Sequence, residues 1–154
     1  DVPIDSIKSL VLGGHGDTMV PMLNYTTVNG KNLKTLINQE KLKSIIDRTR
    51  KGGAEIVKYL QKGSAFYAPA SSGVEMAESY LKDQKKTLPC AAFLNGEYGF
   101  KNLYAGVPVI VGKSGVEKVV ELDLSEEEKK NFEISIKAVR ELLNSAKKID
   151  PKLE

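Results

Sequence analysis

Apolar side chains recur every three or four positions in two long stretches, which predicts two amphipathic helical regions. The first covers residues 39–61, where the Gly52–Gly53 pair interrupts the pattern without shifting its phase. We expect a kinked helix or two helices end to end, with close backbone packing at the glycines; a hinge is the functional alternative. The second begins at Ser125, which forms a capping box with Glu128, and stops before Pro151.

Between these regions the pattern favours strands and turns. A polar loop is expected over residues 63–72, followed by a helix that starts near Ser71 or Ser72. Asn29-Gly30 is a hairpin-type turn signal. The strands expected from runs of β-forming and apolar residues are 10–13, 22–28, 88–94, 107–111 and 116–122. This order predicts an α+β fold in which an antiparallel sheet packs against long helices, as one domain spanning residues 1–154.

The clearest candidate for chemistry is the stretch Gly13-Gly14-His15-Gly16-Asp17-Thr18-Met19-Val20-Pro21, which holds the one histidine of the sequence. Glycine on both sides of His15 lets a ligand approach the ring closely. Imidazole, with an unperturbed pKa of about 6.5, suits proton exchange near neutral pH. The plainer interpretation is a surface histidine in a glycine-rich turn. A metal site at His15 and Asp17 would need more ligands than these two.

Composition narrows the function classes. The chain has 154 residues, 41% hydrophobic and 28% charged, with a net charge of +3 that is too small to indicate nucleic-acid binding. No apolar run reaches the ~20 residues of a membrane span, and no signal peptide is visible. The single cysteine, Cys90, excludes an internal disulfide and predicts a buried free thiol in a reducing compartment, the cytoplasm.

The histidine stretch resembles the catalytic loop of the lactate and malate dehydrogenase superfamily. Its Gly-Gly-His-Gly-Asp-Thr-Met-Val-Pro form is similar to the lactate-dehydrogenase-like malate dehydrogenases, since the lactate dehydrogenases usually carry Glu at the position of Gly14. Four further segments extend the resemblance in family-like order: Gly63–Ser71, Gly96–Gly99, Gly106–Val109 and Gly115–Lys118.

The resemblance implies a C-terminal substrate-binding domain with the fold of the lactate dehydrogenase C-terminal domain. It implies that His15 is the general acid/base for interconverting malate and oxaloacetate with NAD. It also implies that Ser64 and Ala65 line the substrate pocket and that Pro69 lies against the nicotinamide; for all three, simple loop residues are the alternative. No metal is expected, and the intact enzyme is expected to be a homo-oligomer, a dimer or tetramer.

The resemblance implies that half of that enzyme lies outside this sequence. The sequence has no Gly-x-Gly-x-x-Gly turn for a dinucleotide. The family's substrate-binding arginines and its orienting aspartate lie upstream, so Asp17 is expected to be structural. We therefore expect the N-terminal NAD-binding Rossmann domain to be absent from this chain and the chain alone to be inactive. The alternatives are a non-catalytic binding or oligomerisation module with the same fold, or a lactate dehydrogenase fragment.

Overall fold

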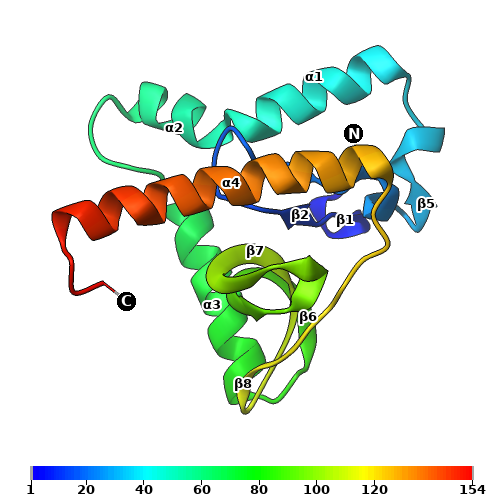
Figure 1. Cartoon of the computed structure of the whole chain (residues 1–154). Coiled ribbons are helices and arrows are strands. Elements are labelled where there is room, and N and C mark those ends of the chain that lie inside the picture. Colours follow the sequence, from blue (N-terminus) through cyan, green and yellow to red (C-terminus); the bar gives the residue numbers. More distant parts are fainter. Residues whose placement is uncertain (1, 154) are drawn as a thin grey trace.

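A computed structural model describes residues 2–153 (Figure 1). Within that range, helices cover small antiparallel sheets. The helices are α1 (Gln39–Arg50), α2 (Gly52–Leu60), α3 (Tyr67–Leu81) and α4 (Glu126–Ile149). The strands are β1 (Ile7–Lys8), β2 (Val11–Leu12), β3 (Val20–Pro21), β4 (Thr27–Val28), β5 (Lys31–Asn32), β6 (Lys86–Asn95), β7 (Lys101–Gly112) and β8 (Gly115–Val119). The predicted α+β class is confirmed.

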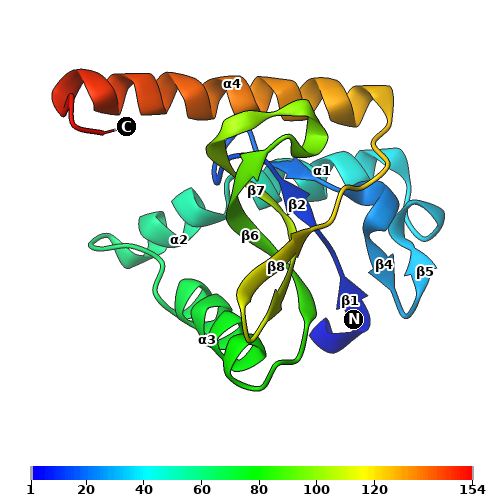
Figure 2. The same cartoon turned by 60° about the horizontal axis from the view of Figure 1, so that its bottom comes forward.

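The largest sheet is the antiparallel β6-β7-β8 meander. Alternate residues of β6 are buried, beginning with Cys90, and Cys90 pairs with the fully buried Val107 of β7. The strand was expected from the unbroken apolar run of residues 88–94 and could have been mostly buried, but the structure buries only every second residue of its latter half. Strand β2, which pairs with β3, lies beside β7 (Figure 2). Leu12 of β2 and Val20 of β3 join the same core.

Helix α4 lies across this core and is fixed at its start. The predicted capping box is present: Glu128 N–H donates to Ser125 Oγ, while Ser125 N–H donates to Glu128 Oε2. One turn later, Phe132 is fully buried and meets the ring edges of Tyr98 and Phe100 at centroid distances of 5.3 and 5.5 Å. The apolar stripe that predicted the helix therefore faces the sheet.

Helix α3 begins earlier than predicted. We expected a loop through residue 72, but the helix starts at Tyr67, and both candidate cap serines lie inside it. Pro69 falls in the first helical turn, where its missing N–H is not needed. Proline therefore marks the beginning of this helix and not, as expected, the centre of a loop.

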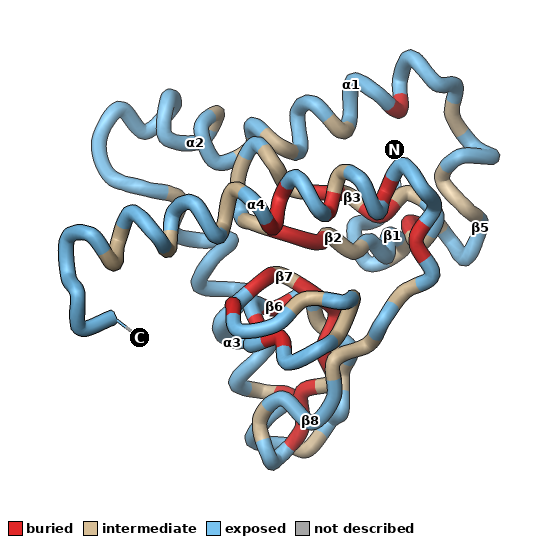
Figure 3. The backbone as a smooth tube through the Cα atoms, viewed as in Figure 1, coloured by how far each residue is buried: buried red, intermediate tan, exposed pale blue. Residues whose placement is uncertain are grey.

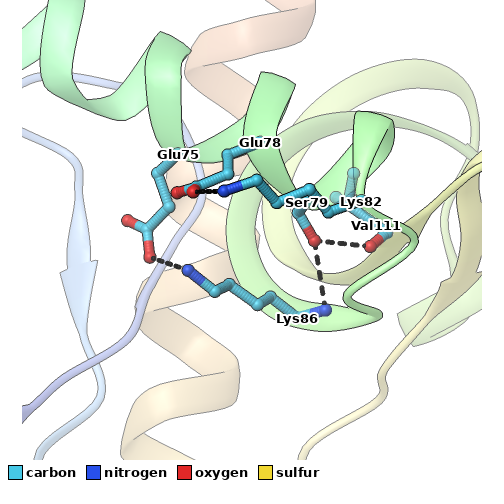
Figure 4. Close-up of polar contacts among 6 residues, drawn as sticks. All are labelled: Glu75, Glu78, Ser79, Lys82, Lys86 and Val111. Carbon is cyan, nitrogen blue, oxygen red and sulfur yellow. Dashed lines mark hydrogen bonds and ion pairs between the residues drawn. The ribbon is translucent and has the colours of Figure 1, made fainter.

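The C-terminal end of α3 is anchored to the sheet by Ser79 (Figure 4). This buried side chain donates to the Val111 carbonyl at 2.7 Å and accepts from Lys86 N–H at 3.2 Å. Lys86 also forms an ion pair with Glu75 at 3.4 Å. The apolar side chains of α3 have no such contact with the sheet: Val74 is 66% exposed and Leu81 is 78% exposed.

The predicted strand over residues 22–28 is mostly wrong. A short 3₁₀ turn, Leu23–Tyr25, replaces its middle, and only β4 remains extended. Thr26 Oγ1 donates to the Met22 carbonyl at 2.9 Å, a side-chain bond that favours a turn over a strand. The turn predicted at Asn29-Gly30 is confirmed, with positive φ at both residues (50° and 75°) between the paired β4 and β5.

The first helical region divides into α1 and α2 at Lys51, as one of the two predicted forms. The prediction that the backbone packs closely at the two glycines is wrong, because a Cβ at Gly52 or Gly53 would meet nothing within 4 Å. The reason is that α2 stands clear of the core, with Val57 and Leu60 more than 40% exposed, and the burial view shows α2 and most of α1 as exposed tube (Figure 3).

The open space around Gly53 means that a larger side chain can be added there without a clash. We expect Gly53→Ala to raise the free energy of unfolding by about 0.5–1 kcal/mol, because alanine reduces the backbone entropy lost in the helix. Gly30→Ala is the matched control: its site is equally open, but its φ of +75° strains an L-residue and should cost about 1 kcal/mol. Urea unfolding followed by circular dichroism measures both. A Gly53→Ala variant less stable than the parent would favour a hinge.

Candidate functional site

His15 lies at the exposed tip of the loop that connects β2 to β3. These two strands pair antiparallel, with Leu12 opposite Val20, so both ends of the loop leave the core side by side. Met19 N–H donates to the Gly16 carbonyl at 2.9 Å and closes a turn inside the loop. A rigid scaffold thus presents the imidazole to solvent, as is common for catalytic side chains.

A backbone pair holds the base of this loop against β7. Gly13 N–H donates to the Gly106 carbonyl at 2.8 Å, and Gly106 N–H donates to the Gly13 carbonyl at 2.9 Å. A Cβ on Gly106 would lie 2.5 Å from the Gly13 oxygen, and Gly13 has φ +90°. Glycine is therefore required at both positions by close approach and by conformation.

The glycines beside the histidine have different surroundings. A Cβ at Gly16 would meet nothing within 4 Å, which fits the open access to the ring that the sequence suggested. A Cβ at Gly14 would lie 3.3 Å from Val139 of α4, so this glycine also lets the loop pack against that helix.

Two side chains that sequence reasoning missed bind the loop. Ser135 of α4 accepts from Gly14 N–H at 2.8 Å and donates to Thr18 Oγ1 at 3.2 Å. Arg50, at the end of α1, donates through Nε to the Met19 carbonyl at 2.9 Å. One signal for Ser135 was present: it is a polar residue within the apolar stripe of α4, next to Ile136.

A cavity of about 440 Å³ opens beside His15. Its walls are mainly apolar and come from the loop, β6, β7 and α4, with Cys90, Tyr104 and Val139 among them. Cys90 is a buried free thiol, as predicted, and burial raises its pKa above that of an exposed thiol. The cavity is large enough to admit a small organic molecule or a side chain next to the imidazole.

The other predicted site residues lie elsewhere. Ser64 and Ala65 form the link before α3, Pro69 lies in its first turn, and none of them lines the cavity at His15. Ser64 and Pro69 are exposed and Ala65 is half-buried. The structure therefore does not bring the two groups into one closed site. Asp17 is exposed at the loop tip, and the structure gives no support for its expected structural role.

Two features that would indicate other classes of function are absent from the described residues. Within residues 2–153, no three His, Cys, Asp or Glu side chains gather in a way that could hold a metal ion. In the same range, no helix combines the length and the apolar character needed to cross a bilayer.

In the described residues, an antiparallel sheet lies under one long helix, and a clamped glycine loop beside them carries an exposed histidine. A family model described as lactate/malate dehydrogenase, alpha/beta C-terminal domain, matches residues 1–150. The malate dehydrogenase of Pelagibacter ubique (strain HTCC1062) is 61% identical over 99% of this chain. The chain belongs to the lactate/malate dehydrogenase family and is its C-terminal domain.

Solved structures agree with this assignment. Malate dehydrogenase from Salinibacter ruber superimposes with a TM-score of 0.94 at 42% identity, covering 100% of this chain and 50% of its own. Lactate dehydrogenase from Eimeria maxima, solved with NADH and oxamate, gives a TM-score of 0.91 at 43% identity, covering 99% and 50%. The chain also covers 49% of the Pelagibacter relative, so it spans about half the length of the proteins it matches.

Proposed function

We propose that this chain is the catalytic C-terminal half of an NAD-dependent malate dehydrogenase that interconverts malate and oxaloacetate. The observation that carries the proposal is His15, exposed on a loop that three other elements hold in place, beside a cavity. Oxidising a 2-hydroxy acid requires a base for the hydroxyl proton while hydride leaves carbon for the nicotinamide. His15 is that base, and in the reverse direction its imidazolium donates the proton to the ketone.

The arginines support the view that this chain does not act alone. A dicarboxylate substrate calls for bidentate guanidinium contacts. Here Arg48 forms such a contact with Glu55 at 3.0 and 3.1 Å, and Arg50 is bound to the Met19 carbonyl. Arg140 donates to the Lys101 carbonyl at 3.3 Å. All three donate within the chain. As the family resemblance implies, the substrate arginines and the NAD-binding domain would then be supplied by an N-terminal half.

The choice of malate over lactate rests on the relative at 61% identity and on Gly14, where a lactate dehydrogenase usually has Glu. Ser64 and Ala65 would then approach the substrate, and Pro69 the nicotinamide, once the two halves meet. Ser64 and Pro69 are exposed and Ala65 is half-buried, so all three are at least partly accessible for this.

A complementation experiment tests the proposal. The 154-residue chain should form no NADH from malate and NAD. Joined to the N-terminal half of the Pelagibacter malate dehydrogenase, it should form NADH from malate but not from lactate. Turnover by the chain alone would overturn its expected inactivity, and a folded chimera that binds NAD but oxidises neither acid would overturn the function.

A non-catalytic binding or oligomerisation module is the second candidate. It is favoured by the exposed apolar surface of α2 and α3, which includes Leu60 at 45%, Leu81 at 78% and Tyr67 at 90% exposure. Patches of this kind mark surfaces that associate. Concentration-dependent self-association of the chain, together with an inactive chimera, would support this module over the enzyme.

A further inference from the structure

The loop that carries His15 is tied to three elements far away in the sequence. Gly106 of β7 pairs with Gly13 at its start, and Arg50 of α1 binds the Met19 carbonyl at its end. Between these two ties, Ser135 of α4 contacts the loop twice. Residues 15–17, which include His15, project beyond the contacts that Ser135 makes at Gly14 and Thr18.

The hydroxyl of Ser135 spans the neck of the loop. It accepts from the Gly14 N–H at 2.8 Å on one side and donates to Thr18 Oγ1 at 3.2 Å on the other. Its side chain is 0% exposed, so water does not compete for these bonds. The two contacts therefore fix the distance between Gly14 and Thr18, which flank the tip of the loop that bears His15.

Helix α4 is a rigid support for this hydroxyl. Ser135 stands beside the buried Ile136 and one turn after the buried Phe132, which packs on Tyr98 and Phe100. The capping box at Ser125 fixes the same helix at its N-terminus. A group held this firmly transmits its position to whatever it binds.

We propose that Ser135, acting with Thr18, is the positioning residue that holds His15 at the distance and angle needed for proton transfer. The proposal rests on the function assigned to His15 above. Ser135 does not touch substrate; it acts through the loop. A displacement of about 1 Å in a reacting group can reduce turnover by a factor of about 100, so a clamp at the neck of the loop has a measurable effect on rate.

Another explanation of a serine at this position is its size. A Cβ on Gly13 would overlap the Ser135 side chain, so the helix and loop touch closely there. Alanine would satisfy that packing as well as serine does, but it would leave Gly14 N–H and Thr18 Oγ1 without their partner. Ser135→Ala therefore separates the two explanations.

The first test is amide hydrogen exchange in the 154-residue chain. We expect Ser135→Ala to speed exchange at Gly14 by roughly tenfold or more, with Gly13, which Gly106 holds, unchanged. Ser145→Ala is the matched control: this exposed serine on the same helix donates to the Glu141 carbonyl, and its loss should leave Gly14 unaffected. Equal exchange at Gly14 in both variants overturns the clamp.

The second test uses kinetics of the chimera described above. We expect Ser135→Ala to lower kcat for malate by roughly 10- to 100-fold, with KM changed much less. Added to His15→Asn, it should cost nothing further, because the clamp acts only through the histidine. Thr18→Val should imitate Ser135→Ala, and Thr18→Ser should restore the rate.

The two tests separate the possible failures. A further loss of rate when Ser135→Ala is added to His15→Asn overturns the positioning role and assigns Ser135 to the fold. If the unsubstituted chimera is inactive, the proposed dehydrogenase function is overturned, and with it the expected effect of Ser135 on rate. Amide hydrogen exchange at Gly14 then still decides whether Ser135 holds the loop.

Discussion

His15→Asn is expected to lower kcat for malate oxidation in the chimera by roughly 10²- to 10⁴-fold, the usual contribution of a general acid/base. Asparagine has a similar shape and retains a hydrogen-bonding group, but it cannot accept and release the proton that malate gives up. Because His15 is exposed, the substitution removes no packing, and the chain should remain as stable as the parent. Initial rates of NADH formation under saturating malate and NAD measure the effect.

Asp17→Asn is the companion variant. It removes the carboxylate two residues along the same exposed turn, and we expect it to change kcat only a few-fold, since the family's orienting aspartate belongs to the other half. If Asp17→Asn were as damaging as His15→Asn, Asp17 would itself orient the imidazole. A His15→Asn chimera with more than a tenth of the parent's rate would contradict the role of His15 as the base.

Gly106→Ala is expected to have the largest effect on stability, lowering the free energy of unfolding by about 2–3 kcal/mol. The added Cβ would lie 2.5 Å from the Gly13 carbonyl oxygen, and this oxygen belongs to backbone that is itself bonded to Gly106. Relief requires β7 and the histidine loop to separate, which weakens both hydrogen bonds between them. Urea unfolding followed by circular dichroism measures the loss.

Gly16→Ala provides the control within the same loop. A Cβ there would meet nothing within 4 Å, so the stability should change by no more than about 0.5 kcal/mol. Similar values for the two alanine variants would show that the pair between Gly13 and Gly106 adds little to the fold. A large loss confined to Gly106→Ala would confirm that the loop is built on it.

Local patterns predicted the elements that bury one regular face within this chain. Strand β6 has its apolar run, and α4 has its apolar stripe together with the capping box at Ser125. Helix α2 shows the limit of this reasoning: Ile56 and Leu60 lie on an apolar face, yet they are 40% and 45% exposed. Amphipathicity predicts that a helix has a partner, but it does not say that the partner is in the same chain.

The site was predictable only as far as its chemistry is local. His15 and its flanking glycines are adjacent in sequence, so the loop could be recognised directly. Its supports could not, because Ser135 is 121 positions from Gly14, and no periodic pattern links them. The serine within the apolar stripe of α4 indicated a buried polar contact without identifying the partner.

The same long-range ties determine when the loop can form as the chain is made. Gly14 can form its bond to Ser135 only after that serine, 121 residues later, has been synthesised. Closing loops of this length costs entropy that local contacts cannot offset. During synthesis we therefore expect the segment that bears His15 to leave the ribosome early in this domain and to become ordered only once Ser135 has been made.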